Sequence, residues 1–152
     1  MPYTIIIPIH NEAGTIPALL DELKPYAQEH ELLLINDGST DDTSMWISKA
    51  KQNFGCKVIT LEENEGKRKA IQTALQENES EVTVLIDSDV QISRNGLLEI
   101  VRGFSDENIA VVCGNTGVSN ANRNLLTRMQ EMYYYLSYGL FRSAESHFKT
   151  VV

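Results

Sequence analysis

Residues 3–9 read YTIIIPI, an apolar run of strand length in which most side chains are β-branched. Because consecutive positions are apolar, and not only every second one, this run predicts a strand buried on both faces, as in a parallel sheet covered by helices. A helix is expected next, with Thr15 as its N-cap, Pro17 in its first turn and Pro25 at its end. The chain therefore opens with a strand followed by a helix.

The same alternation continues along the rest of the chain. Further apolar runs predict strands at residues 31–36, 57–61, 82–86 and 109–113. Helix-periodic stretches predict helices after the acidic loop 37–42, at 67–76, at 93–104 and at 124–148. The acids of that loop are expected in the first turn of the helix that follows it. Alternating strands and helices predict an α/β fold with a mostly parallel sheet flanked by helices.

Composition favours one globular domain. The 152 residues are 42% hydrophobic and 22% charged, with no repeat and no linker-like segment, so we expect residues 1–152 to form a single unit. The formal net charge of −8 argues against a general electrostatic grip on nucleic acid or anionic membrane. The two cysteines, Cys56 and Cys113, do not make a disulfide framework or a metal-ligand set, and we expect both thiols to be buried.

The chain shows neither a signal peptide nor an apolar stretch approaching the roughly 20 residues of a membrane span, so a cytoplasmic location is expected. It ends in an apolar, strand-like run at residues 149–152, with no turn or cap after it. We therefore expect the chain to be cut inside a larger fold.

Polar residues follow four of the predicted strands. Ligands of open parallel sheets bind beyond the carboxyl ends of the strands, so these residues define a candidate site. They are Pro8, His10, Asn11 and Glu12; Asn36, Asp37, Gly38 and Ser39; Asn64, Gly66, Lys67 and Arg68; and Asp87 and Asp89.

Asp87 and Asp89 are the sharpest feature of this set. Two carboxylates one residue apart at a strand end can share a hard divalent cation, Mg²⁺ or Mn²⁺, together with the phosphates of a ligand. The alternative is that either aspartate caps a turn, which is a common use of the residue.

Three other strand-end residues have two readings each. Asp37 can accept a hydrogen bond from a base or a ribose, or it can form a turn that starts the next helix. Lys67 and Arg68 follow Gly66 at a helix start, where two cations suit a diphosphate, but they can equally belong to a solvated basic patch with Lys69.

Several common sites are excluded. His10 has no second histidine at a helical metal spacing, so a histidine zinc site is not supported. The dinucleotide fingerprint, the P-loop and the nucleophile elbow are all missing. The tyrosines at 133–135 and 138 predict a packing face in preference to a stacking platform.

Four segments, taken together and in this order, resemble family 2 glycosyltransferases of the GT-A fold: IIIPIHNE at 5–12, INDGSTDDT at 35–43, NEGKRKA at 64–70 and LIDSD at 85–89. The GKRKA form is similar to that of the processive, membrane-embedded synthases of hyaluronan, chitin and related polysaccharides. The stretch from Gly114 through Asn122 and Arg123 to the tyrosine-rich helix is similar to them as well.

The resemblance implies a Rossmann-like nucleotide-binding half of a GT-A fold, in an inverting enzyme that transfers a sugar from a UDP-sugar to a growing polysaccharide or another acceptor. It also implies a set of roles. Pro8, His10 and Glu12 would line the nucleotide pocket, and Asp37 would contact the uracil or ribose. Lys67 and Arg68 would lie beside the uridine and diphosphate. Asp87 would contact the nucleotide and, together with Asp89, would place Mg²⁺ or Mn²⁺ against the departing diphosphate.

The chain departs from the family pattern in two ways. Asn36 stands where many members carry a first aspartate. The later catalytic-base carboxylate and the Gln-x-x-Arg-Trp segment of processive members do not occur, and the only tryptophan is Trp46. The resemblance therefore implies a donor-binding half without its base, which would bind nucleotide weakly and transfer sugar poorly or not at all. Saccharide or lipid-linked acceptors, and a membrane location, would belong to the full-length protein.

Three other interpretations stay open or are discounted. A lipid-phosphate glycosyltransferase of the dolichyl-phosphate type would use a GDP-sugar or a UDP-sugar. A non-catalytic nucleotide-binding module would bind the nucleotide without transferring a sugar. Separately, an exposed sheet edge or an exposed tyrosine helix would let the chain form oligomers. A receiver-type signalling domain is discounted because it needs an acidic pair after the first strand, where only Glu12 stands.

Overall fold

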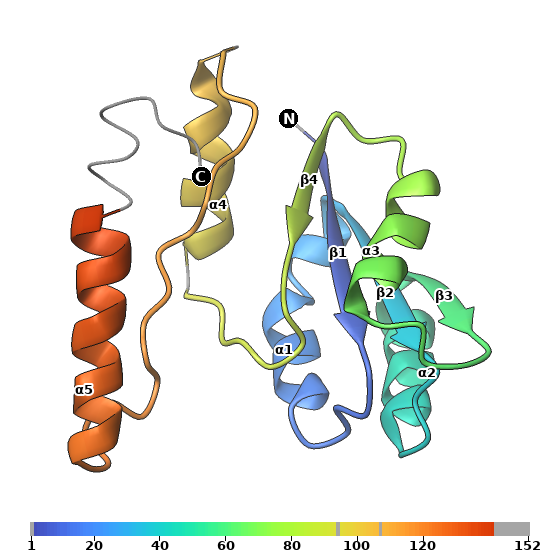
Figure 1. Cartoon of the computed structure of the whole chain (residues 1–152). Helices are drawn as coiled ribbons and strands as arrows, with labels where there is room; N and C mark the ends of the chain where they lie inside the picture. Colours follow the sequence, from blue (N-terminus) through green and yellow to red (C-terminus); the bar gives the residue numbers. More distant parts are fainter. Residues whose placement is uncertain (1, 94, 107, 142–152) are drawn as a thin grey trace. The chain divides into compact units, whose positions relative to one another are not determined.

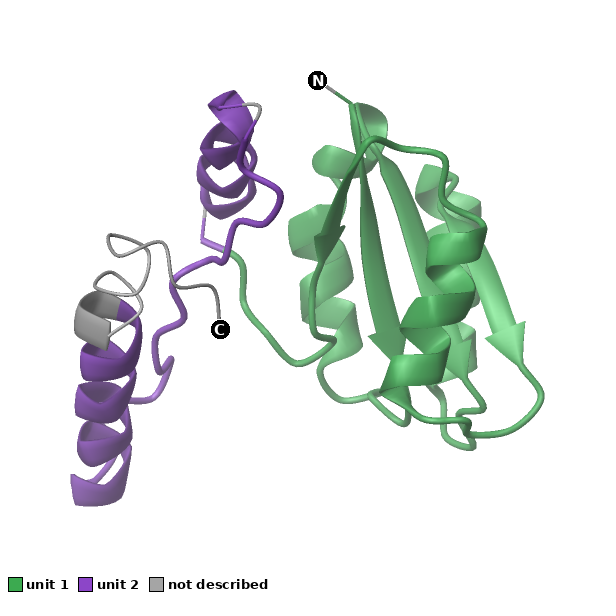
Figure 2. Ribbon diagram, turned by 45° about the horizontal axis from the view of Figure 1, so that its top comes forward, with its two compact units in different colours: residues 1–92 green, residues 93–152 purple. Residues whose placement is uncertain are grey.

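The computed structural model describes residues 2–93, 95–106 and 108–141, with the side chains of 139–141 left aside. The chain divides into two compact units, residues 1–92 and residues 93–152, which Figure 2 shows in different colours. Each unit is considered by itself.

The first unit is built on a sheet of four parallel strands: β1 (Tyr3–Ile9), β2 (Glu31–Asp37), β3 (Lys57–Leu61) and β4 (Val82–Leu85). The strand order is β3-β2-β1-β4, so the first strand lies in the interior of the sheet. Ile5 lies opposite Leu32 of β2 on one side and Val84 of β4 on the other. This arrangement confirms the predicted α/β fold with a parallel sheet.

Helices cover both faces of the sheet. They are α1 (Ile16–Leu23), α2 (Thr43–Phe54) and α3 (Lys67–Gln76), with a short 3₁₀ turn, η1 (Tyr26–Gln28). Figure 1 shows α3 on one face and α1 and α2 on the other. Ala70 and Ala74 of α3 pack against Ile6, Leu33 and Ile35 of the sheet. All seven residues of β1 are buried, as expected for a strand covered on both sides.

Of two local predictions at helix starts, one is confirmed in position and one is wrong. Thr15 is the N-cap of α1 and Pro17 lies in its first turn, as predicted, although the Thr15 hydroxyl makes no capping hydrogen bond and donates to the Glu12 carboxylate. No acid lies in the first turn of α2, which begins at Thr43 directly after Asp42. Asp37 and Asp41 accept from backbone amides, and Asp42 stands directly before the helix, so none of the three acids lies inside it.

The second unit contains α4 (Gly96–Arg102), a 3₁₀ turn η2 (Gly103–Ser105), α5 (Leu125–Tyr134) and a π-helical segment η3 (Tyr135–Phe141). Asn124 caps α5, accepting from the Thr127 amide at 2.9 Å. The predicted helix at 93–104 is shorter than expected, since α4 spans only Gly96–Arg102. The last predicted helix begins where expected, and its residues 142–148 lie outside the described part of the chain.

The predicted strand at 109–113 is absent, since the structure shows no regular element there. The run pairs with no strand of the sheet, whose order ends at β4. An apolar run forms a strand only where a neighbouring strand can hydrogen-bond with it and its side chains can pack against other residues. Instead Val112 lies close to Gly103, where an added Cβ would meet the valine Cγ2 at 2.7 Å.

Three further expectations are resolved by exposure and by helix length. Cys56 is buried as predicted, whereas Cys113 is exposed. Tyr133 and Tyr135 are 66% and 70% exposed, so they do not form a buried packing face. Among the described residues, no helix has both the length and the apolar character to cross a membrane.

Candidate nucleotide-binding site

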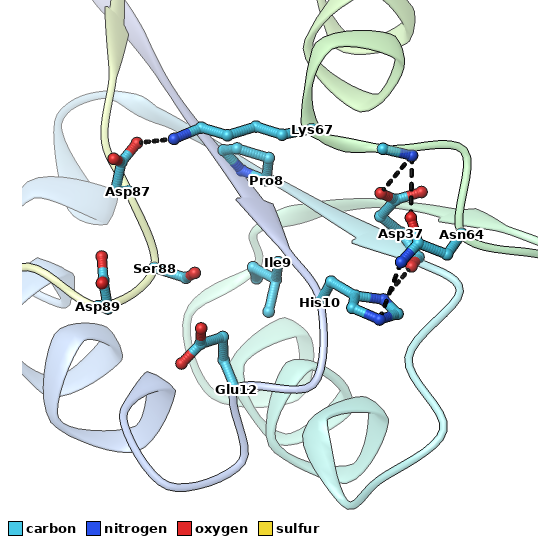
Figure 3. Close-up of a pocket in the computed structure, with 11 residues that line it drawn as sticks. Pro8, Ile9, His10, Glu12, Asp37, Asn64, Lys67, Asp87, Ser88 and Asp89 are labelled. Atoms are coloured by element: carbon cyan, nitrogen blue, oxygen red, sulfur yellow. Dashed lines mark hydrogen bonds and ion pairs between the residues drawn. The ribbon is translucent and has the colours of Figure 1, made fainter.

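A cavity of about 430 Å³ lies at the carboxyl ends of β1, β2 and β4, next to the N-terminus of α3 (Figure 3). Its walls come from four separate segments of the first unit. They contain Pro8, Ile9, His10 and Glu12; Asp37; Asn64, Gly66 and Lys67; and Asp87, Ser88 and Asp89. Of the residues to which the resemblance gives a role, the structure brings all but Arg68 into one cavity. Of the other strand-end residues, Asn64 and Gly66 line it, whereas Asn11, Asn36, Gly38 and Ser39 do not.

Arg68 follows Lys67 on α3 but does not line the cavity. Successive residues of an α-helix are turned by about 100°, so two neighbours cannot face the same ligand equally. Both residues are exposed, but Lys67 lines the cavity and Arg68 does not, so the basic-patch interpretation fits Arg68 better than Lys67.

Asp37 ends β2 and is only 2% exposed. Its two carboxylate oxygens accept from the backbone amides of Glu65 at 2.8 Å and Gly66 at 3.0 Å. Asp37 therefore anchors the loop that leads into α3, and this anchor fixes where Lys67 begins the helix. The turn that starts α2 is supported instead by Asn36, whose Oδ1 accepts from the Ser39 amide at 3.0 Å.

The imidazole of His10 uses both of its nitrogens within the protein. Nδ1 lies 2.6 Å from the backbone carbonyl oxygen of Asp37. Nε2 lies 2.9 Å from the side-chain amide nitrogen of Asn64 and 3.1 Å from the side-chain amide nitrogen of Asn11. The Oδ1 atoms of Asn64 and Asn11 accept backbone N–H groups of Gly66 and Thr40, which sets the orientation of both amides. Nε2 is consequently the acceptor and Nδ1 carries the proton. The ring face is what remains for a ligand.

Asn11 joins the loops after β1 and β2. It adopts a positive φ of 54°, its amide donates to the Ser39 hydroxyl at 3.1 Å, and its Oδ1 accepts from the Thr40 amide at 2.8 Å. Asp41 adds to the same junction by accepting from the amides of Ala13 and Thr43. Hydrogen bonding from Thr43 lowers the pKa of Asp41 below its ordinary value. These bonds hold the cavity wall in place before any ligand arrives.

Lys67 and Asp87 form an ion pair across the cavity, with Nζ 2.6 Å from Oδ1 (Figure 3). Both side chains are more than half exposed. Asp89 lines the cavity from the same short segment as Asp87. The lining thus carries four carboxylates, those of Glu12, Asp37, Asp87 and Asp89, against the single ammonium of Lys67.

The donor set at Asp87 and Asp89 fits a hard divalent cation only if a ligand completes it. Within the described ranges, no three His, Cys, Asp or Glu side chains gather into a group that could hold a metal ion alone. Mg²⁺ and similar ions are commonly bound by one or two carboxylates together with substrate phosphates and water. An acidic cavity with two such carboxylates suits that arrangement.

Sequence reasoning missed Ile9 and Ser88 as lining residues, and it included Asn64 and Gly66 among the strand-end residues without giving either a role of its own. Ile9 and Ser88 each lie between two predicted site residues, which was an available signal. The hydrogen bonds of His10 with Asn11 and Asn64 had no signal in the sequence, because they depend on how three loops meet.

Comparison with known proteins assigns the chain to a family. The family model for glycosyl transferase family 2 matches residues 4–151, and the chain therefore belongs to family 2 of the glycosyltransferases. Hyaluronan synthase of Streptococcus pyogenes is 30% identical over 151 residues, covering 93% of this chain and 36% of the relative. The chain spans about a third of the length of such curated relatives.

Solved glycosyltransferase structures share the fold. The mannosyltransferase PcManGT from Pyrobaculum calidifontis, in complex with GDP-Man and Mn²⁺, matches with a TM-score of 0.64 and 26% identity, covering 70% of this chain and 33% of that one. S. aureus TarS 1-349, in complex with UDP-GlcNAc, matches with a TM-score of 0.61 and 32% identity, covering 70% and 32%. The predicted GT-A fold is confirmed by these likenesses.

Proposed function

We propose that this chain is the donor-binding part of an inverting glycosyltransferase that moves a sugar from a UDP-sugar to a growing polysaccharide or another acceptor. The observation that carries the proposal is the cavity itself, which Asp87 and Asp89 line together with Lys67, the first residue of a ten-residue helix. A helix N-terminus with a lysine suits a diphosphate, and two carboxylates suit the cation that accompanies it. The likeness to TarS in complex with UDP-GlcNAc supports the same class of donor.

Each cavity residue has a proposed role in holding the donor. The ring face of His10 and the side chain of Pro8 offer apolar surface to the base, while Asp37 has lone pairs left to accept from the base or ribose. Lys67 binds the diphosphate, and Asp87 and Asp89 hold Mg²⁺ or Mn²⁺. When bound, that ion neutralises charge on the departing diphosphate and orients it.

No residue of this chain is proposed as the catalytic base. Inversion by direct displacement needs a group that deprotonates the acceptor hydroxyl, and the chain spans about a third of its relatives. We propose that acceptor binding, the base and the membrane association typical of the processive synthases belong to further parts of the complete enzyme. The 152 residues alone are expected to bind the donor and to transfer sugar poorly or not at all.

A lipid-phosphate sugar transferase that uses a GDP-sugar is the second candidate, favoured by the likeness to a mannosyltransferase bound to GDP-Man. The two candidates differ in the base of the donor. A titration that compares UDP with GDP separates them.

The test is calorimetry with UDP, with and without Mn²⁺, and with GDP as the comparison. We expect UDP to bind in the presence of Mn²⁺ and GDP to bind more weakly. Asp89→Ala should lower the affinity for UDP with Mn²⁺ by roughly tenfold or more, because the cation loses a charged ligand, with an unchanged melting temperature.

The matched control is Asp21→Ala, which removes an exposed carboxylate from α1, outside the cavity. Preference for GDP would favour the second candidate. Unchanged UDP affinity in Asp89→Ala would remove the metal assignment, and absence of binding to either nucleotide would favour a module of another kind.

A further inference from the structure

The ion pair between Lys67 and Asp87 joins two elements that are distant in the sequence. Lys67 is the first residue of α3, and Asp87 lies two residues beyond the end of β4. Figure 3 shows the lysine side chain extended past Pro8 toward Asp87, and Nζ meets Oδ1 at 2.6 Å. The ammonium therefore sits on one of the two carboxylates to which the proposed function assigns the divalent cation.

A cation that approaches Asp87 must displace this ammonium or be repelled by it. The pair is open to exchange, because the Lys67 side chain is 57% exposed and the Asp87 side chain 54% exposed. Ion pairs in such surroundings contribute little net stability, since water competes for both partners. Lys67 can thus leave Asp87 at low cost when a better anionic partner arrives.

A diphosphate is such a partner. Of the described side chains that line the cavity, Lys67 alone is cationic, and the other charged ones are four carboxylates. A nucleoside diphosphate therefore needs Lys67 for itself, and the move of the ammonium from Asp87 to a phosphate would expose the carboxylate to the metal. This one movement of Lys67 would then provide both the cation that binds the diphosphate and the free Asp87 carboxylate that binds the metal.

We propose that Lys67 is an internal counter-ion that occupies Asp87 until the donor binds, and that it thereby couples metal binding to diphosphate binding. The inference rests on the proposed function, since it takes the diphosphate and the cation from there. Linkage requires the coupling to be reciprocal: the nucleotide raises the affinity for the metal by the same factor by which the metal raises the affinity for the nucleotide.

The first test uses the metal alone, without nucleotide. Mn²⁺ is titrated into the 152-residue chain, its Lys67→Met variant and its Lys69→Met variant, and free Mn²⁺ is followed by electron paramagnetic resonance. Lys67→Met keeps the apolar stem of the side chain and removes the charge. Lys69→Met removes the same charge from the same helix at an exposed position that does not line the cavity.

Lys67→Met should bind Mn²⁺ alone at least about fivefold more tightly than the unmodified chain, because the cation no longer competes with an ammonium for Asp87. Lys69→Met should differ little from the unmodified chain. Equal or weaker Mn²⁺ binding in Lys67→Met, or an equal gain in Lys69→Met, overturns the proposal.

The second test asks whether the gain passes through Asp87. In the Asp87→Asn background, adding Lys67→Met should leave Mn²⁺ affinity unchanged, because the carboxylate with which the lysine pairs is no longer there. A gain that persists in this background means that Lys67 acts by general charge and overturns the counter-ion role. Thermal melts of all variants verify the fold, which two exposed side chains should not disturb.

The third measurement is the ratio of UDP affinities with and without Mn²⁺. That ratio should fall in Lys67→Met and stay the same in Lys69→Met. If the unmodified chain binds no UDP with Mn²⁺, the proposed function fails. The binding of Mn²⁺ alone to the unmodified chain and to Lys67→Met still decides whether Lys67 competes with the metal for Asp87. The two failures are therefore distinguishable.

Discussion

Asp37 shows how one side chain can serve the fold and the site together. It is buried at the end of β2, and its carboxylate accepts from the two backbone amides that precede Lys67. Each carboxylate oxygen has a further lone pair, so the residue can hold the loop and still face a ligand. The loop in turn sets the starting point of α3 and the reach of Lys67.

Asp37→Asn should destabilise the chain by about 1–3 kcal/mol, because an amide NH₂ group would face a partly buried backbone N–H where an acceptor is needed. UDP affinity should fall as well, since Lys67 loses its fixed starting point. Urea unfolding and calorimetry measure the two effects, with the exposed Asp21→Asn as the control. An unfolding midpoint equal to that of the unmodified chain would contradict the anchoring role.

His30 offers a second residue-level case, away from the cavity. Its ring stacks on Tyr3 with centroids 3.7 Å apart. Both His30 Nδ1 and the Tyr3 hydroxyl are buried, and neither has a hydrogen-bond partner among the residues that the structure describes. Burial lowers the pKa of His30, and nearby Glu29 opposes this in part. The native state therefore favours the neutral imidazole.

The sign of the pH effect follows from this shift. The unfolded chain takes up a proton at His30 near pH 6.5, whereas the native state does so only at a lower pH, so stability is lost as the pH falls through about 6.5 toward the native pKa. His30→Phe keeps the stack, should flatten this slope, and should add about 1 kcal/mol at pH 6 by removing an unpartnered nitrogen. Urea unfolding at a series of pH values checks it; equal slopes in both chains would count against the assignment.

At the scale of elements, the site depends on how closely three loops meet beyond the sheet. Gly38 has a φ of +59°, and a Cβ there would lie 2.4 Å from the Glu63 carbonyl carbon and 2.5 Å from the Asn64 nitrogen. Both contacts are with backbone, which cannot turn aside as a side chain can. Glycine is therefore required for the loop after β2 to pass the loop after β3.

Gly38→Ala and Gly55→Ala make a matched pair. Both glycines have positive φ, but a Cβ at Gly55, which ends α2, would meet nothing within 4 Å. Gly55→Ala should cost about 1 kcal/mol for the left-handed backbone alone. Gly38→Ala should cost clearly more, by roughly 2 kcal/mol or above, because the clash adds to the same conformational term. Equal unfolding midpoints in urea would show that the loops can separate freely.

The elements around the cavity were predictable because their signals are local. β1, β3 and α3 have the predicted bounds, and β2 and β4 differ by one residue at their ends. The run at 109–113 has the same apolar character as β3, yet it forms no strand, because a ladder partner is a property of the whole sheet. Strand-end reasoning found Asp37, Lys67 and Asp87 for the same local reason. It could not find the contacts between loops that orient His10.

At the scale of the whole molecule, the cavity belongs to one unit. Every lining residue lies between Pro8 and Asp89, and the four strands and three long helices that position them lie within residues 1–92. This unit also contains the buried strand residues and the helix alanines that pack on them. Domains smaller than this can bury enough surface to fold alone.

A chain ending at Ile92 should therefore fold cooperatively. Its affinity for UDP in the presence of Mn²⁺ should lie within about threefold of that of the 152-residue chain, because the strands and helices that position the site are retained. Circular dichroism with urea unfolding tests the fold, and calorimetry tests the binding. Asp89→Ala in the shortened chain should lower the affinity for UDP with Mn²⁺ by roughly tenfold or more, the loss also expected in the longer chain. A folded chain with much weaker binding would mean that residues 93–152 contribute to the donor site. A chain that fails to unfold cooperatively would mean that the sheet needs those residues to be stable, and the site would then depend on both units.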